Sequence, residues 1–199
     1  GEEIGYLLKQ PLPPVQPGFP AQVVGTGPTI RYSAMPEMFE SLFHAARREL
    51  TISTPYYVPD ESMQNALCAA AWRGVRTTII FPARNDSWIV AAASRSYYAD
   101  LLDAGVQIFE YEGGLLHTKS VVVDRQVALF GSVNLDVRSF WLDFEVTLGV
   151  YDPDFAERLI TLQDKYIENS IPVNLQTWQQ RPGKERFIEN LARLASPLL

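Results

Sequence analysis

The chain has 199 residues, 47% hydrophobic and 20% charged, which suffices for one globular domain with a sizeable core. The formal net charge of −6 argues against a general nucleic-acid binder, which is usually basic, and the single cysteine, Cys68, excludes an internal disulfide. Two histidines and one cysteine are too few for a usual structural zinc site, and no apolar run approaches the roughly 20 residues that cross a bilayer.

The first 20 residues are predicted to be a linker. Residues 10–20 contain five prolines, which fit neither a helix nor the interior of a sheet. The chain begins at Gly1 without a methionine or a signal peptide. We therefore interpret residues 1–20 as a proline-rich linker from a missing N-terminal half.

Alternating strand and helix patterns begin at residue 21. Strands are predicted at residues 21–24, 50–54, 75–81, 106–111 and 144–150. Helices are predicted at residues 33–46, 60–74, 87–103 and 153–166. This order predicts parallel crossovers and then an antiparallel meander. We expect residues 21–170 to form an α/β domain, with a mixed parallel/antiparallel sheet flanked by helices on both faces.

A stiff aromatic loop follows the strand at residues 50–54. It holds two prolines and two tyrosines, Tyr56 and Tyr57, at a strand end, where sites of α/β folds gather. We predict that both tyrosines line a substrate site. An ordinary packed loop is the alternative.

The densest group of polar side chains lies in residues 113–139. His117 and Lys119 are two residues apart, so an extended strand would project both from one face. Asp124 follows Lys119 by an odd step, at the end of an apolar run, and is expected to support the turn there. Ser132 and Asn134 repeat the two-residue spacing. An imidazole, a cation and two hydrogen-bond donors suit a phosphate ester.

These residue types suggest a division of labour on a phosphodiester. His117 can act as nucleophile or as general acid, but one imidazole cannot do both in a single step. A second histidine is therefore needed, and His44, off the apolar stripe of its helix, is expected to be a surface residue. Gly114 would allow close approach of backbone and substrate. Glu145 could hold an imidazole in one tautomer, or take part in an ordinary salt bridge.

The C-terminal segment, residues 171–199, is predicted to be a tail with an amphipathic helix at residues 184–194. Phe187, Leu191 and Leu194 share one side of this helix, and lysine and arginine residues lie among them. The helix could rest on an anionic membrane surface or dock on the domain.

The motif His117-x-Lys119-x-x-x-x-Asp124, followed by Gly131-Ser132-x-Asn134, resembles the HKD signature of the phospholipase D superfamily. Further blocks resemble the C-terminal catalytic half of bacterial cardiolipin synthases. They are TPYYVP at 54–59, GGLLHTKS at 113–120, NLDxRS at 134–139, FE at 144–145 and SPLL at 196–199.

The resemblance implies a phospholipase D-like fold and a lipid reaction without metal or cofactor. A phosphatidyl group would pass from one phosphatidylglycerol through a phosphohistidine to a second phosphatidylglycerol, which yields cardiolipin and glycerol. Two HKD halves form one such site, so the resemblance implies a second half in the same protein, or a second chain as homodimer. His117, in the C-terminal motif, would be the acid/base. The location implied is the bacterial cell membrane, peripheral or through an N-terminal membrane segment absent from this chain.

Two other interpretations stay open. One is a homodimeric HKD phosphodiesterase or nuclease, against which the acidic balance and the cardiolipin-synthase blocks argue. The other is a non-catalytic interaction module that keeps the fold, against which the intact His117, Lys119, Ser132 and Asn134 argue.

Overall fold

A computed structural model describes residues 11, 14, 17–29 and 32–194, so most of the predicted linker and the SPLL block lie outside the described residues. The strands are β1 (Ala21–Thr26), β2 (Glu49–Ser53), β3 (Tyr57–Val58), β4 (Arg76–Pro82), β5 (Gln107–Tyr111), β6 (Ser120–Val123), β7 (Val127–Gly131), β8 (Leu135–Asp136), β9 (Glu145–Val150) and β10 (Ser170–Val173). The helices are α1 (Ala34–Ala45), α2 (Glu61–Trp72), α3 (Trp88–Ser96), α4 (Tyr98–Asp103), α5 (Val137–Trp141), α6 (Pro153–Glu168), α7 (Leu175–Gln179) and α8 (Gly183–Leu194).

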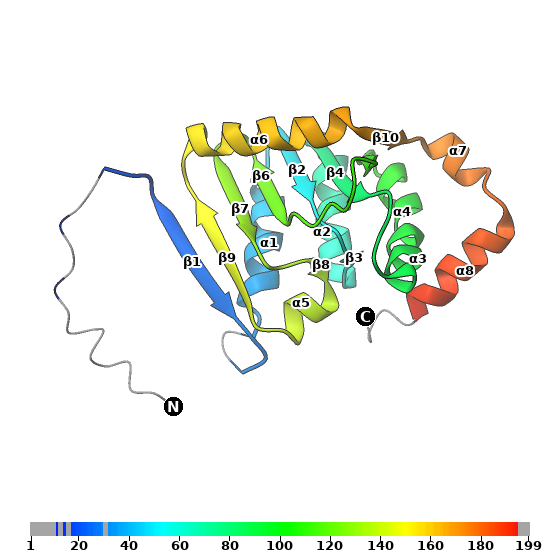
Figure 1. Cartoon of the computed structure of the whole chain (residues 1–199), viewed down its shortest axis with the longest axis horizontal. Coiled ribbons are helices and arrows are strands. Elements are labelled where there is room, and N and C mark those ends of the chain that lie inside the picture. The colour runs from blue at the N-terminus through cyan, green and yellow to red at the C-terminus, as the bar shows by residue number, and fades with distance from the viewer. Residues whose placement is uncertain (1–10, 12–13, 15–16, 30–31, 195–199) are drawn as a thin grey trace.

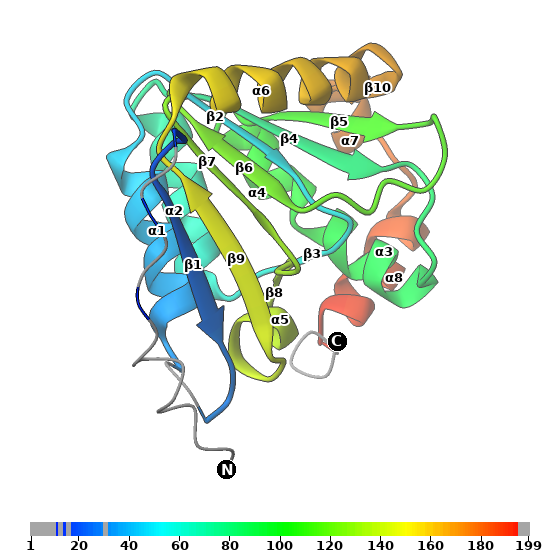
Figure 2. The same cartoon turned by 60° about the vertical axis from the view of Figure 1, so that its left-hand side comes forward.

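The main sheet is mixed, as the sequence predicts. Its strand order is β1-β9-β7-β6-β2-β4-β5-β10. The central strands β2, β4 and β5 run parallel, whereas β6, β7 and β9 form the antiparallel meander. Helix α6 lies across one face, and α1 and α2 cover the other (Figures 1 and 2). The α/β class with helices on both faces is therefore confirmed.

The first strand differs from the prediction. We expected residues 21–24 to begin the parallel series, but β1 pairs antiparallel with β9 at the edge of the sheet. The physical reason is that periodicity marks a strand without specifying its partner. The first three of the six residues of β1 are exposed, which is typical of an edge strand.

The helix predicted at residues 87–103 is divided in two. Helix α3 ends at Ser96 and α4 begins at Tyr98. Tyr97 lies between them in a turn, with φ of −89° and ψ of −14°. The Ser96 hydroxyl donates to the carbonyl of Ala93 at 2.6 Å. Such bonds from a serine back to its own helix compete with the helical backbone pattern and bend it.

The main hydrophobic core lies between the sheet and the α1–α2 face. Its largest fully buried side chains include Phe43, Leu50, Ile52 and Leu67. A smaller apolar cluster packs beneath α6 on the opposite face. The sheet is thus buried on both sides, and the polar groups of the site are confined to the ends of its strands.

The C-terminal segment continues the domain. Strand β10 pairs antiparallel with β5 at the second edge of the sheet. Helix α8 packs on α3 (Figure 1). Of the two possibilities that the sequence offers for this helix, docking on the domain is therefore observed.

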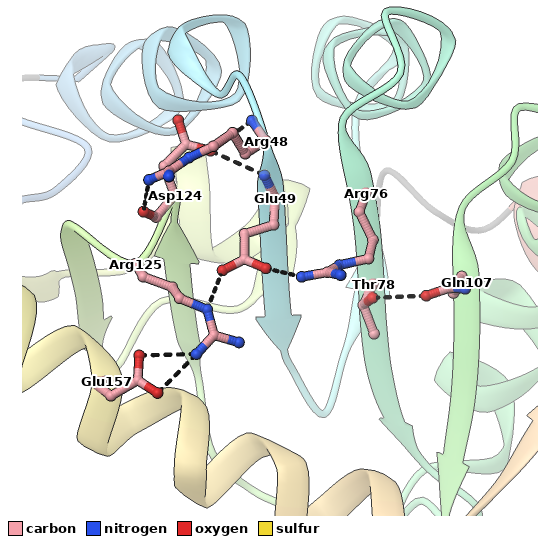
Figure 3. A network of polar contacts seen from close by, with 8 residues as sticks. All are labelled: Arg48, Glu49, Arg76, Thr78, Gln107, Asp124, Arg125 and Glu157. Carbon is pink, nitrogen blue, oxygen red and sulfur yellow. Dashed lines mark hydrogen bonds and ion pairs between the residues drawn. The ribbon is translucent and has the colours of Figure 1, made fainter.

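The turn between β6 and β7 carries a polar network (Figure 3). Asp124 and Arg125 both have positive φ, of 52° and 56°, as the central residues of a type I′ hairpin turn require. The Asp124 carboxylate accepts hydrogen bonds from the backbone N–H groups of Arg47, Arg48 and Glu49, at 3.0, 2.7 and 2.9 Å. It thereby anchors the turn to the start of β2.

Beside this anchor, a chain of ion pairs crosses the sheet. Glu49 contacts both Arg76 and Arg125, and Arg125 reaches Glu157 on α6 at 2.7 Å (Figure 3). The arginines are substantially exposed, so these pairs fix geometry more than they add stability.

Candidate active site

His117 and Lys119 meet in the segment that leads from β5 into β6. Lys119 Nζ lies 2.8 Å from Nδ1 of His117 and also donates to the His117 carbonyl at 3.0 Å. Strand β6 begins only at Ser120, so the pair precedes the strand on which the sequence placed it. The structure nevertheless brings the two side chains together, His117 exposed and Lys119 half-buried.

The contact between them has a chemical consequence. A lysine ammonium can only donate hydrogen bonds, so Nδ1 of a neutral imidazole must be the acceptor and Nε2 must carry the proton. When the ammonium turns away, Nδ1 can take a proton, and the resulting imidazolium can give its Nε2 proton to a leaving alkoxide. Burial lowers the pKa of Lys119, while the negative charges of Glu145, Asp136 and Asp86 act in the opposite direction.

Tyr56 forms one wall beside the imidazole. Its ring stands edge-on to His117 with 6.0 Å between the centroids, and its hydroxyl donates to Asp86 at 2.7 Å. Burial and the Asp86 carboxylate raise the pKa of Tyr56 to about 12. The phenol therefore stays protonated and holds its position at neutral pH.

Tyr57 does not face the site, and its prediction as a substrate-binding residue is wrong. Its side chain is completely buried, packs on Phe81 and Tyr97, and its hydroxyl donates to Gln64. The physical reason is the alternation of side chains in an extended segment, which points two consecutive residues to opposite sides.

Strand β3 pairs with β8 in a separate two-stranded parallel sheet. This pairing holds the loop with Tyr56 against the segment that carries Ser132 and Asn134. Asn134 Nδ2 donates to the Ser139 hydroxyl at 3.1 Å, and its buried Oδ1 has no hydrogen-bond partner among the described residues.

The side chains of Ser132 and Glu145 are hydrogen-bonded to each other. The Ser132 hydroxyl donates to the Glu145 carboxylate and accepts from the Val146 N–H at 3.0 Å. Within the described part of the chain, the hydrogen bond of Glu145 therefore goes to Ser132, and none joins it to His117. The predicted role of Glu145 as a holder of this imidazole has no contact to support it.

Two further predicted residues shape the backbone, and neither is hydrogen-bonded to His117 or Lys119 among the described residues. Gly114 has a φ of +123°, a conformation that favours glycine, and nothing lies within 4 Å of where a Cβ would stand. Asp124 is separated from Lys119 by the whole of β6 and contacts the backbone at the start of β2. Asp124 therefore lies outside the site and supports the hairpin turn, as the sequence predicts, although it belongs to the HKD motif.

Two features of the site were missed in the sequence. Asp136 is buried, accepts from the Ser139 N–H at 2.6 Å as the cap of α5, and burial raises its pKa to about 6. An Asp three residues before a Ser, at the start of a helix, was the available signal.

The second feature lies behind Lys119. The hydroxyls of Ser53 and Ser120 are 2.7 Å apart, and Gln163 of α6, fully buried, donates to Ser120 at 3.1 Å. No pattern in the sequence marks Gln163, because its partners are more than 40 residues away.

Comparisons with known proteins agree with this geometry. Residues 39–166 match the family model described as cardiolipin synthase, PLD-like domain. The chain is 43% identical over 204 residues to cardiolipin synthase A of Serratia proteamaculans, covering 99% of this chain and 42% of that protein. It is 44% identical over 178 residues to cardiolipin synthase A of Buchnera aphidicola, covering 89% and 37%. The chain thus spans about two fifths of the length of these curated relatives.

Solved structures show the same fold at low identity. Nuc of Salmonella typhimurium, a phospholipase D family member, superposes with a TM-score of 0.67 at 17% identity, covering 78% of this chain and 98% of Nuc. Phosphatidylserine synthase of Haemophilus influenzae superposes with a TM-score of 0.71 at 20% identity, covering 89% and 46%. The architecture is therefore that of a phospholipase D-like domain. The family match is more specific: the chain belongs to the PLD-like domain family of cardiolipin synthases.

Proposed function

We propose that this chain supplies one HKD half-site of an enzyme that transfers a phosphatidyl group between two phosphatidylglycerol molecules, giving cardiolipin and glycerol. The observation that carries the proposal is the His117–Lys119 pair, an imidazole and a cation 2.8 Å apart just before the start of β6. The relatives named cardiolipin synthase A supply the substrate class.

The reaction requires a second imidazole. His44 lies in the last turn of α1, shortly before β2, whereas the site lies at the opposite end of β2, beside Ser53. The nucleophile therefore comes from a second HKD half, in the same protein or in a second chain. Its imidazole nitrogen bonds to the donor phosphorus while the bond to the glycerol oxygen breaks, and His117 gives that oxygen its proton.

The second half of the reaction reverses the proton transfer. His117 takes the proton from a hydroxyl of the acceptor phosphatidylglycerol, whose oxygen bonds to phosphorus as the phosphorus–nitrogen bond breaks. Lys119 neutralises phosphate oxygens in both steps, which requires its ammonium to turn from the imidazole to the phosphate. No step needs a metal or a redox cofactor.

The direct test is cardiolipin formation. The chain is incubated with phosphatidylglycerol vesicles, alone and with a second HKD half, and lipid products are identified by mass spectrometry. We expect cardiolipin only where two halves are present, whether by addition or by dimerisation. Release of nucleotides from DNA at a comparable rate would instead favour the nuclease interpretation, and no product of either kind would favour the non-catalytic one.

A membrane surface is the expected partner, and α8 supports this. The helix docks through its polar side: Glu189 is buried and pairs with Arg181 at 2.6 Å, and Arg193 stacks over Tyr97 at 4.2 Å. Its apolar side consequently faces outward, and exposed fractions there reach 68% at Phe187, 57% at Leu191 and 78% at Leu194. A docked amphipathic helix normally buries this side.

An outward apolar stripe suits a helix that lies in a membrane interface. The exposed Lys184 and Arg186 provide cations for anionic headgroups. Among the described helices, none is both long and apolar enough to cross a bilayer. We therefore propose that the domain rests on the bacterial cell membrane through α8.

Replacing Phe187 and Leu191 together with glutamate is expected to weaken binding to phosphatidylglycerol vesicles at least tenfold. The change removes two large side chains from the lipid and adds two charges that anionic headgroups repel. Co-sedimentation with vesicles measures the effect. The matched control replaces Val23 and Ile171, exposed on the two edge strands, with glutamate. Equal binding by both double variants would contradict a role for α8.

A further inference from the structure

A cavity of about 340 Å³ adjoins the catalytic pair and is separate from it. Tyr56 forms part of its wall on the side of His117, and the other walls come from α3, β8 and α5. The lining residues on which its chemistry depends are Val58, Val90, Asn134, Asp136, Ser139 and Asp143. Neither His117 nor Lys119 lines the cavity, so its contents would be held beside the reacting atoms.

The cavity offers hydrogen-bond acceptors with unused capacity. Asn134 Oδ1 is buried without a partner among the described residues. Asp136 is 6% exposed and accepts from both the N–H (2.6 Å) and the hydroxyl of Ser139, which leaves some lone pairs of its two carboxylate oxygens unused. A buried acceptor without a donor costs free energy, so a ligand O–H group is favoured at Asn134 Oδ1, and the remaining lone pairs of Asp136 can accept from a second O–H group.

The charge of the cavity selects against a second phosphate. Asp136 and Asp143 both line it, and Arg138 at its rim is already paired with Asp143 at 3.1 Å. An anion would be repelled by the Asp136 carboxylate, which has no ion-pair partner among the described residues, whereas a neutral polyol would not be repelled. Val58 and Val90 provide apolar surface for its carbon atoms. These features together fit a small polyhydroxylated group.

We propose that this cavity is the acceptor subsite, which holds the hydroxylated head of the acceptor alcohol and directs one of its hydroxyls towards His117. Asp136 is then the residue that determines specificity for a polyol over a simple alcohol. The proposal rests on the proposed phosphatidyl transfer, for which it names the acceptor class and the residues that recognise it. The donor phosphate remains with His117 and Lys119.

Asp136→Asn tests the proposal in the catalytically competent assembly of this chain with a second HKD half. Vesicles of phosphatidylglycerol serve as donor, and isotopically labelled glycerol and 1-propanol compete as soluble acceptors. We expect the ratio of labelled phosphatidylglycerol to phosphatidylpropanol to fall about tenfold, as for the loss of one charge-assisted hydrogen bond. Asparagine caps a helix as well as aspartate does, so α5 should persist.

The matched control is Asp152→Asn, the same change at the cap of α6, where Asp152 accepts from the Phe155 N–H at 2.7 Å beyond the far end of β9. It should leave the ratio unchanged. If Asp136→Asn does not fold, Val90→Phe, which narrows the cavity, is expected to lower the same ratio. An unchanged ratio in the folded variants overturns the acceptor subsite. Absence of any lipid product from the unchanged protein overturns the proposed transfer and the subsite with it.

Discussion

Replacing His117 with alanine is expected to slow cardiolipin formation about 10³-fold, the usual contribution of a general acid–base group. The imidazole is exposed, and within the described part of the chain its side-chain hydrogen bonds are with Lys119, so the fold should not depend on it. The rate is measured as cardiolipin formed from phosphatidylglycerol in the assembly with a second HKD half. His44→Ala, the same change at the other histidine, is the control and should retain full activity.

The same variant separates the two roles open to His117. If His117 is the acid, a donor whose leaving group is p-nitrophenolate needs no proton, and His117→Ala should release nitrophenol in a burst close to that of the unchanged protein. If His117 is the nucleophile, the burst disappears with the rest of the activity. Full cardiolipin synthesis by His117→Ala would contradict both roles.

Much of the architecture could be predicted because local sequence patterns determine it. The strands at residues 50–54, 75–81 and 106–111 are short segments rich in β-branched and aromatic residues and bounded by turn residues, and they form the parallel centre of the sheet. The close contact of His117 and Lys119 likewise follows from a two-residue spacing in extended backbone. Patterns of this kind need no knowledge of distant partners.

The same alternation rule, applied more strictly, would have separated the two tyrosines. Tyr56 and Tyr57 are consecutive in extended backbone, so only one of them can face the site. Tyr57 is buried in the hydrophobic core, and the ring of Tyr56 lies beside His117. The error came from treating an aromatic pair as a unit.

Other features depend on long-range pairing that no local pattern encodes. The edge position of β1, the pairing of β3 with β8 and the placement of Gln163 behind Ser120 each join residues far apart in the chain. The orientation of α8 is a stronger case, because its amphipathic pattern predicts the opposite face inward. A buried ion pair, between Arg181 and Glu189, accompanies this orientation.

The HKD motif joins residues that lie at opposite ends of one strand: His117 and Lys119 in the candidate site, and Asp124 in the hairpin turn. His117 and Lys119 lie before the first residue of β6. Asp124 lies at the other end of the strand, where Figure 3 shows its contacts with Arg48 and Glu49. The short strand between them is held at both ends, by the Gln163–Ser120 bond and by the carboxylate of Asp124. The position of the His117–Lys119 pair is therefore expected to depend on a residue that contacts neither of them.

Replacing Asp124 with alanine is accordingly expected to lower the free energy of unfolding by about 2 kcal/mol, measured by urea denaturation. It removes the acceptor for three backbone N–H groups and places alanine at a positive φ. Asp124→Asn, which keeps one acceptor oxygen and tolerates that φ, should cost about half as much. Asp164→Asn, exposed in the middle of α6, is the control and should change stability by less than about 0.5 kcal/mol.

The pH dependence of the free energy of unfolding provides a second test of the Asp124 carboxylate. Partial burial raises its pKa, but the N–H groups of Glu49, Arg48 and Arg47 outweigh this and hold the pKa below its ordinary value. The stabilisation is then fully present above the unfolded-state pKa of about 4 and is lost as the pH falls through the lower folded-state pKa. The stability difference between the unchanged protein and Asp124→Asn should therefore shrink below about pH 4. A difference that stays constant down to pH 2 would mean that the ionised carboxylate does not hold the hairpin.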